Sequence, residues 1–474
     1  MTLKPAAPAF LDHLGTLVGP KGLRPAVARY LEEPRGRWQG SAAAVVAPGS
    51  VQEVAAVLAA CTAAQVGVVP YSGGTGLVGG QVMPDGGGAV LLSLERMAAV
   101  RAVYPDENVL IAEAGCILQD VHRAAEAVDR LYPLTIASKG SARIGGLLAT
   151  NAGGVNVLRY GNARDLCLGL EVVLADGRIW NGLSRLRKDN TGYDLRNLMI
   201  GSEGTLGVIT AASLKLSPRP SGEGTALFVV PSPAAALRLL ALARDHMGEG
   251  ISAFELMSGM GLRFLADKLP DLRRPFADMP AWFVLIDVGL ARGLDPAEAL
   301  AALFAAAVDE GLASDGVIAA SEAQRHAFWE VREQIPEANR RVGAISSHDI
   351  SVPLEAVATF IAEADAHFAR VGPAMGGLRI NCFGHLGDGN LHYNVFPAEG
   401  RSKADYADVR DAVQRAVHDI CHALGGSHSA EHGIGRLKVD DLVRYGDPVK
   451  IAMMRGVKAL FDPVGILNPG AVLG

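Results

Sequence analysis

Three glycine-rich segments in the first half of the chain constrain its fold more than any other feature. The first, Val68–Gly80, reads VVPYSGGTGLVGG and contains the spacing G-x-G-x-x-G at Gly74, Gly76 and Gly79. This spacing is typical of dinucleotide-binding domains, where a strand precedes it and a helix begins at the third glycine. The strand is expected here, but the sequence that follows, QVMPDGGG, cannot continue a helix. We therefore reject an NAD-binding helix and expect a loop whose backbone N–H groups bind a phosphate.

Two further segments of the same kind follow. GSARIGGLLATNAGG spans residues 140–154, and KDNTGYDLRNLMIGSEGTLGVIT spans residues 188–210. Backbone with few side chains is needed where a flat ligand and its diphosphate lie against the chain. One such segment is equally consistent with an ordinary glycine-rich turn, but three in one domain predict a large, extended ligand.

Length and composition exclude several classes of protein. The chain has 474 residues, 49% hydrophobic and 20% charged, so we expect two or three folding units with large cores. A net charge of −6 without a long basic run argues against nucleic acid or an anionic membrane as the main partner. Five cysteines without C-x-x-C spacing favour a reducing compartment. The N-terminus lacks a continuous apolar segment, and every apolar stretch carries charges. We expect a cytoplasmic protein that is not integral to a membrane.

Secondary-structure patterns divide the chain into three blocks. Up to about residue 220, short β-like runs alternate with alanine-rich helices, one of which starts at a capping box of Ser50 and Glu53. LEVVLADGRIW predicts a hairpin with a type I′ turn at Asp176-Gly177. SPRPSGEG, residues 217–224, is the best domain boundary, because its prolines and glycines interrupt both helices and strands.

The second block predicts an α+β layer. Strands and helices follow in the order β-α-β-β-α-β, from TALFVVPS through ISAFELMS and WFVLIDVGL to SDGVIAAS. This order favours an antiparallel, ferredoxin-like sheet with helices on one face. The third block starts near residue 328 and holds most of the histidines, so we expect chemistry there.

A histidine pair in the third block suggests a metal site. INCFGHLGDGNLHYNV predicts a hairpin with a two-residue loop at Asp388-Gly389, which places His385 directly opposite His392. Opposite residues have Cβ atoms about 4.5–5.5 Å apart, so both imidazoles can share one divalent cation. Asn394 points to the same face and can reach a bound ligand. The alternative is a stacked or hydrogen-bonded histidine pair at a strand edge.

The segment SHSAEHGIGRLK adds Glu431 and His432 to this pair. Nearby glycines leave both side chains exposed. Two histidines and a glutamate suit Zn²⁺ or Mn²⁺ and leave coordination positions for a substrate. The dipeptide Glu-His alone carries little information, because it is common by chance.

The glycine-rich segments and YGNARDLCLGLEVVLADG (160–177) resemble the FAD-binding domain of the flavoprotein family related to vanillyl-alcohol oxidase. Within it, the chain is most similar to the FAD-linked D-2-hydroxy-acid dehydrogenases, including its last 90 residues. The resemblance implies an α+β fold in three parts. Residues 1–220 would form a PCMH-type FAD-binding domain with two subdomains. Residues 221–435 would form a ferredoxin-like substrate domain with a metal site, and residues 436–474 would pack back on the FAD-binding domain.

The same resemblance implies which residues contact FAD. Neither of the first two glycine-rich segments contains a histidine, so covalent attachment through histidine is not expected. The expected contacts come from the three glycine-rich segments and the C-terminal ILNPG: Pro70, Ser72, Gly73, Gly74, Thr75, Gly76, Leu77, Ser141, Gly145, Gly146, Thr150, Asn151, Gly153, Gly154, Glu203, Gly204, Ile209 and Asn468.

In the third block the resemblance implies that His385, His392 and Glu431 bind the metal and that His432 lies beside the substrate. Asn394 is also expected to bind substrate.

It implies further that Arg332, in FWEVREQIPEANRR, binds a substrate carboxylate, a task that suits a planar bidentate donor. The alternative is a surface arginine paired with Glu330 or Glu333.

These parts predict oxidation of a D-2-hydroxy acid to the 2-oxo acid. The metal would bind the α-hydroxyl and one carboxylate oxygen and lower the pKa of the hydroxyl. His432, with an ordinary pKa of about 6.5, would take the proton while hydride passes to N5 of the flavin. The expected electron acceptor is an electron-transfer flavoprotein, a quinone or a cytochrome rather than O₂. Homodimerisation stays open.

Two residues depart from the hydroxyglutarate pattern of the similar enzymes. Ser347 stands where they usually carry a substrate-contacting lysine, and Pro336 where some carry threonine. D-2-Hydroxyglutarate is therefore one candidate beside D-malate, D-lactate and longer or aromatic D-2-hydroxy acids, with Arg340 or Arg341 as candidate replacements for the lysine. Two other classes stay open: a glycolate-oxidase-type subunit that works with iron–sulfur partners, and a non-catalytic assembly subunit.

Overall fold

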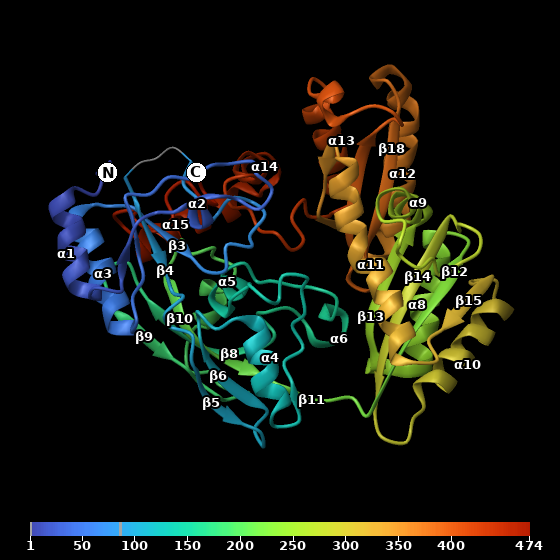
Figure 1. Cartoon of the computed structure of the whole chain (residues 1–474), viewed down its shortest axis with the longest axis horizontal. Coiled ribbons are helices and arrows are strands. Elements are labelled where there is room, and N and C mark those ends of the chain that lie inside the picture. The colour runs from blue at the N-terminus through green and yellow to red at the C-terminus, as the bar shows by residue number, and fades with distance from the viewer. Residues whose placement is uncertain (1, 85–87) are drawn as a thin grey trace. The chain divides into compact units, whose positions relative to one another are not determined.

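The computed structural model describes residues 2–84 and 88–474 and divides the chain into two compact units (Figure 1). Unit 1 comprises Met1–Gly154, Gly161–Arg219 and Glu431–Gly474, and unit 2 comprises Val155–Tyr160 and Pro220–Ala430. The chain therefore leaves unit 1 inside the predicted proline- and glycine-rich boundary and returns to it at Glu431. In the described part of the chain, no helix has the length and apolarity needed to cross a membrane.

Unit 1 contains two main sheets. The first has the order β1-β2-β4-β3 and consists of Leu23–Arg24, Ala44–Val46, Val90–Ser93 and Val68–Tyr71, with β2 and β3 parallel to β4. The second is antiparallel with the order β5-β6-β10-β8-β9 and consists of Val100–Tyr104, Val109–Glu113, Val208–Lys215, Cys167–Val173 and Ile179–Gly182. A short pair joins β7 (Arg130–Leu131) to β11 (Ser217–Pro218).

Helices of four to fourteen residues complete unit 1. They are α1 (Pro8–Val18), α2 (Ala28–Leu31), α3 (Val51–Ala64), α4 (Leu118–Glu126), α5 (Ile144–Ala149), α7 (Arg196–Met199), α14 (Val439–Tyr445) and α15 (Pro448–Phe461). The predicted start of α3 is confirmed, because the Ser50 hydroxyl accepts the N–H of Glu53 at 3.2 Å. The Glu53 carboxylate accepts the N–H of Gly49 at 2.7 Å instead of that of Ser50, so the predicted box is only half formed.

The predicted hairpin of β8 and β9 forms, but its turn differs from the prediction. A type I′ turn needs a positive φ at both central residues, and here Gly177 has a φ of 86° while Asp176 does not lie in that region. The N–H of Gly177 donates to the carbonyl of Leu174 at 3.0 Å, and the N–H of Leu174 donates to the carbonyl of Arg178 at 2.9 Å. The loop is thus one residue longer, with glycine at its left-handed position.

Unit 2 is built on one large antiparallel sheet with the order β15-β12-β14-β13-β18-β19-β16, and β17 also pairs with β19. Its strands are β12 (Gly222–Val230), β13 (Ile251–Ser258), β14 (Trp282–Leu290), β15 (Asp315–Ile318), β16 (Ser346–Ser347), β17 (Ile350–Ser351), β18 (Leu378–His385) and β19 (Asn390–Pro397). The first four have the ferredoxin-like order 4-1-3-2, as predicted from the sequence.

Helices cover both faces of this sheet, so the prediction of helices on one face is wrong. Phe228, Phe254 and Ile286 form a core with α8 (Pro233–Met247), α10 (Pro296–Asp309), α12 (Val357–Val371) and α13 (Arg410–Ala423). Met257 and Phe283 on the other face pack against α9 (Gly259–Lys268) and α11 (Glu322–Val342). Strands β13 and β14 explain this, because their residues are buried on both sides of the sheet and helices must therefore pack on each face. A short helix, α6 (Val157–Tyr160), also belongs to this unit.

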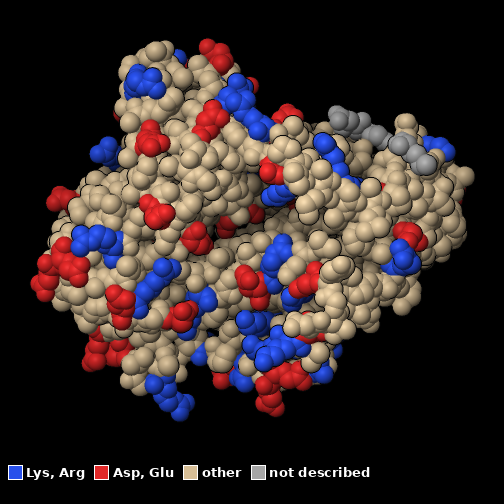
Figure 2. Space-filling model, turned by 180° about the vertical axis from the view of Figure 1, so that it is seen from behind, with Lys and Arg blue, Asp and Glu red and all other residues tan. Residues whose placement is uncertain are grey.

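The C-terminal segment joins the edge of the first sheet of unit 1. Val68 donates its N–H to the carbonyl of Ile466 and accepts the N–H of Asn468, both at 2.8 Å. Helices α14 and α15, red in Figure 1, lie in the same unit as the N-terminal strands. On the surface seen in Figure 2, basic and acidic side chains are interspersed.

Candidate active site

A pocket in unit 1 is lined by all three glycine-rich segments. The expected FAD contacts that line it are Pro70, Ser72, Gly73, Gly74, Thr75, Gly76, Gly145, Gly146, Thr150, Glu203, Gly204, Ile209 and Asn468. His432, expected beside the substrate, lines the same pocket. The remaining expected contacts do not line it: Leu77, Ser141, Asn151, Gly153 and Gly154. Arg143, Leu92 and Gln81 are lining residues that the sequence patterns did not indicate.

The loop after β3 has the character of a phosphate-binding loop without a helix. No helix begins at Gly79; the next helix along the described chain is α4. The backbone N–H groups of Gly73, Gly74, Thr75 and Gly76 donate no hydrogen bond to any described residue. Donors without a protein acceptor in a pocket fit an anionic group such as the FAD diphosphate. This geometry excludes the NAD-type arrangement.

Glycine is needed in these segments because two of them touch. A Cβ on Gly73 would lie 2.4 Å from the carbonyl oxygen of Ser141, and a Cβ on Gly146 would lie 2.8 Å from the Cβ of Ser72. The Gly146 N–H also donates to the Ser72 hydroxyl at 3.0 Å. Part of the glycine pattern therefore reflects backbone packing between the segments, in addition to space for a ligand.

We expect the Gly146→Val variant to lose FAD during purification, because the added side chain would push the second glycine-rich segment away from Ser72. The visible absorbance of the purified protein measures this loss. Gly456→Ala is the matched control, because a Cβ at Gly456 would meet no atom within 4 Å. Full flavin content in Gly146→Val would contradict the packing argument.

Two of the lining residues also hold the C-terminal segment in place. The Glu203 carboxylate accepts the N–H groups of Ile434 and Gly435, each at 2.8 Å. Burial nevertheless raises the pKa of Glu203. The Asn468 amide donates to the carbonyls of Gly80 and Glu203 at 3.0 and 2.9 Å. Through these bonds, Glu203 and Asn468 tie the end of the chain to the pocket wall.

In unit 2, the hairpin that carries the two histidines has a different register from the predicted one. Phe383, not His385, lies opposite His392, because a 3-10 turn at Leu386–Asp388 lengthens the loop. The register is shifted by two residues, which keeps both histidines on the same face. Their ring centroids lie 5.6 Å apart.

The residue opposite His385 is Glu255 of β13, which was not among the predicted site residues. Its carboxylate binds Nδ1 of His385 and Nε of Arg332, both at 2.6 Å, and its side chain is fully buried. Burial raises the pKa of Glu255, but the charges and hydrogen bonds of His385 and Arg332 outweigh this and lower the pKa to about 2. The one signal in the sequence was a glutamate inside the otherwise apolar strand ISAFELMS.

Arg332 projects from α11 into the interior of unit 2. Its side chain is 7% exposed and its guanidinium carbon lies 4.8 Å from the centre of the Phe383 ring. The alternative of a surface arginine paired with Glu330 or Glu333 is therefore wrong. The bond to Glu255 uses Nε, and the two terminal nitrogens donate no hydrogen bond to a described residue. They are available to a carboxylate.

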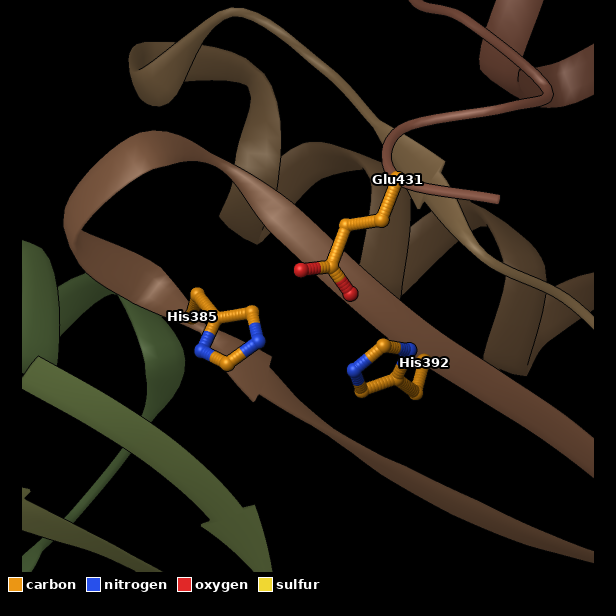
Figure 3. A group of neighbouring side chains, drawn as sticks. All are labelled: His385, His392 and Glu431. Carbon is orange, nitrogen blue, oxygen red and sulfur yellow. The ribbon is translucent and has the colours of Figure 1, made fainter. Parts of the chain in front are cut away.

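The expected metal ligands come together. Donor atoms of His385, His392 and Glu431 all lie within 4.8 Å of one another. Glu431 directly follows Ala430, whose N–H donates to the carbonyl of Asp349 at 3.2 Å. In Figure 3 the carboxylate of Glu431 points toward both imidazoles.

The donors fit a divalent metal. Because Nδ1 of His385 binds Glu255, Nε2 is the nitrogen that can bind a cation, and a carboxylate behind a ligating histidine is the usual supporting arrangement. Donor atoms of Asp349, Glu431 and His432 form a second group within 4.8 Å of one another. The structure thus brings His432 next to one of the expected metal ligands.

The residues expected around the substrate lie on β19, β16 and α11. Asn394 lies opposite Ser347, and its amide donates to the carbonyl of His392 at 3.1 Å. Arg340 and Arg341, the candidate replacements for the missing lysine, both bind Glu337, at 2.7 and 2.8 Å. Both arginines therefore share one carboxylate.

Comparison with known proteins identifies the family. The model for the C-terminal domain of FAD linked oxidases matches residues 219–472, and that for a FAD binding domain matches residues 42–182. The chain belongs to the FAD-linked oxidase family. The expected FAD cofactor and the assignment as an oxidoreductase are confirmed by this membership and by the relatives that follow.

This FAD-linked oxidase is 39% identical to the mitochondrial D-2-hydroxyglutarate dehydrogenase of Bos taurus, over 94% of its own length and 80% of the relative's. It is 38% identical to the D-2-hydroxyglutarate dehydrogenase of Xanthomonas citri pv. viticola, over 92% and 90% of the two chains. The resemblance to the D-2-hydroxy-acid dehydrogenases is thereby confirmed.

Solved structures confirm the fold. p-Cresol methylhydroxylase has a TM-score of 0.76 at 16% identity, covering 100% of this chain and 99% of the other. 4-Ethylphenol oxidase from Gulosibacter chungangensis has a TM-score of 0.72 at 17% identity, with 99% and 98% coverage. The FAD-linked oxidase therefore has the predicted PCMH-type α+β fold.

Proposed function

We propose that the protein oxidises a D-2-hydroxy acid to the corresponding 2-oxo acid with the help of a divalent metal, Zn²⁺ or Mn²⁺. The observation that carries this proposal is the carboxylate of Glu255, which links Arg332 to His385 of the His385–His392–Glu431 donor group. Glu255 thus holds a metal ligand and a guanidinium close to each other. This arrangement suits a ligand that chelates a cation at one end and carries an anionic group for Arg332.

The two bound groups would supply different chemistry. The glycine-rich pocket would hold FAD, which would supply the hydride-accepting chemistry. His385, His392 and Glu431 would hold the metal, which would supply Lewis-acid chemistry that makes the substrate hydroxyl more acidic.

The protein's own side chains bind the substrate and move the proton. The terminal nitrogens of Arg332 donate to a substrate carboxylate, while Glu255 holds Arg332 and His385 in fixed orientations. A ring nitrogen of His432 accepts the proton of the substrate hydroxyl, with neighbouring carboxylates of Asp349 and Glu431 to stabilise the resulting imidazolium. Asn394 is the proposed additional hydrogen-bond donor to the substrate.

D-2-Hydroxyglutarate is the first candidate substrate, because it appears in the names of relatives that are 38–39% identical over most of the chain. D-Malate and D-lactate are the next candidates. Ser347 adds no charge near Asn394, and Arg340 and Arg341 are paired with Glu337. These features weaken the case for a substrate with a second, distal carboxylate.

The expected test result is anaerobic bleaching of the flavin absorbance by D-2-hydroxy acids and not by their L-enantiomers. Incubation with a strong chelator should abolish the bleaching, and Zn²⁺ or Mn²⁺ should restore it, because the metal acidifies the hydroxyl. Rapid bleaching of a protein that elemental analysis shows to be metal-free would contradict the metal's role. Bleaching by none of the D-acids would contradict the proposed activity itself.

We also propose that electrons leave through an acceptor other than O₂, such as an electron-transfer flavoprotein or a quinone, and that the protein acts in the cytoplasm. One relative, from Saccharomyces cerevisiae, is named D-2-hydroxyglutarate--pyruvate transhydrogenase and is 32% identical.

A glycolate-oxidase-type subunit would co-purify with iron–sulfur partners. A non-catalytic subunit would leave the His385, His392 and Glu431 donor group without a purpose.

A further inference from the structure

Unit 1 contains a second cavity, of about 350 Å³, which shares no lining residue with the glycine-rich pocket. It lies where the start of β8, the start of α7, the end of β10 and the loop after β9 meet. Its wall contains four cationic side chains and one carboxylate: Arg164, Arg187, Arg196, Lys215 and Asp165. We call this feature the basic cavity.

The two sites lie far apart along one strand. Val208 and Ile209 at the start of β10 line the glycine-rich pocket, while Lys215 at its end lines the basic cavity. A strand rises about 3.3 Å per residue, so the span between them is roughly 20 Å. The basic cavity is therefore separate from the glycine-rich pocket, with which it shares no lining residue.

Three of the cations in the basic cavity form no ion pair with a described residue. They are Arg164, Arg187 and Lys215. Two carboxylates outside the wall are already paired with other arginines: Asp194 with Arg196 at 2.7 Å and Glu107 with Arg185 at 2.8 Å.

The three uncharged residues of the wall, Cys167, Leu168 and Asn197, do not offset this charge. Burial raises the pKa of the Cys167 thiol to about 12, so the thiol is uncharged, and Leu168 is apolar. The one acidic lining residue, Asp165, accepts the N–H of Asn162 at 3.0 Å and sets one negative charge against the four cationic side chains. Cations held together in a concave site raise the local concentration of anions.

Two of the guanidinium groups are held in fixed positions. Arg164 donates to the carbonyls of Asn197 and Ile200, at 2.6 and 2.8 Å. Arg196 donates to the carbonyl of Cys167 and to Asp194, both at 2.7 Å. A ligand that binds here needs to order only Arg187 and Lys215, so the entropic cost of binding is low.

We propose that the basic cavity binds a phosphate-type dianion, either inorganic phosphate or the phosphate group of an ester. Guanidinium and ammonium groups form strong, charge-assisted bonds to phosphate oxygens. The volume is at the lower end of the range for small-molecule sites, which suits a small polar ligand.

The test is calorimetric titration of the full-length, FAD-loaded protein with inorganic phosphate, with ionic strength held constant by chloride. We expect saturable binding of one phosphate per chain. Lys215→Gln and Arg187→Gln should each weaken it by about tenfold or more, as expected for loss of a charge-assisted bond. Arg185→Gln is the matched control in the same loop, because Arg185 is already paired with Glu107; it should change the affinity less than twofold.

A second arm of the test repeats the titration with glycerol phosphate. Tighter binding of the ester than of inorganic phosphate would identify an ester as the natural source, and equal binding would identify free phosphate. The absence of saturable phosphate binding would overturn the proposal. Equal weakening of phosphate binding by all three variants would also overturn it, because that result indicates an effect of overall charge and not of a specific site. Flavin bleaching by D-2-hydroxy acids should be normal in every variant, so failure here is distinguishable from failure of the proposed activity.

Discussion

The His432→Ala variant is expected to keep its FAD but to be reduced by substrate at least about a hundredfold more slowly than the wild type. General base catalysis typically contributes a factor of 10² to 10⁴, and no other group in the proposed mechanism takes the hydroxyl proton. His432 lines the glycine-rich pocket and lies in one donor group with Asp349 and Glu431. Stopped-flow absorbance under anaerobic conditions measures the rate of flavin reduction directly.

The control for this variant is His246→Ala, an exposed histidine at the end of α8. It should reduce at the wild-type rate. The flavin spectrum of His432→Ala before mixing checks that the pocket is intact. A rate within a few-fold of wild type, with full flavin content, would show that another group accepts the proton.

Replacing Glu255 by glutamine is expected to impair metal binding and substrate binding together. Glu255 is the shared partner of His385 and Arg332, so the amide removes the carboxylate that orients a metal ligand and a substrate-binding guanidinium at once. Loss of such a supporting group typically lowers metal affinity 10- to 100-fold. Breaking a buried ion pair also destabilises the fold by roughly 3–5 kcal/mol. Metal content, KM and thermal unfolding measure the three effects.

Asp287→Asn provides a matched control in the neighbouring strand β14. Asp287 is also buried and is also paired with an arginine, Arg325, at 3.3 Å. This variant should lose stability but keep its metal and its KM. If Glu255→Gln loses stability while its metal content and KM match those of Asp287→Asn, Glu255 has a structural role only.

Much of the site was predictable because its signals are local. The glycine-rich segments indicated a ligand pocket, since only backbone without Cβ atoms can approach a ligand or another segment so closely. The failure of a helix to start at Gly79 was likewise visible in QVMPDGGG. The cluster of His385, His392 and Glu431 followed from residue type and from the resemblance, not from spacing, because the predicted hairpin register was two residues off.

What the amino-acid sequence determined about this protein is the set of elements and the chemical groups available to it. Caps, turn glycines and alternating apolar residues act over a few positions, so the order of the strands β12 to β15 follows from them, although helix α9 between β13 and β14 was not predicted. Tertiary structure alone decided the pairing of Glu255 with His385 and Arg332, residues separated by 130 and 77 positions. It also decided that both faces of the sheet are covered and that Lys215 joins Arg164 in a cavity. These outcomes depend on which strands become neighbours, and no local pattern specifies a contact between residues so far apart.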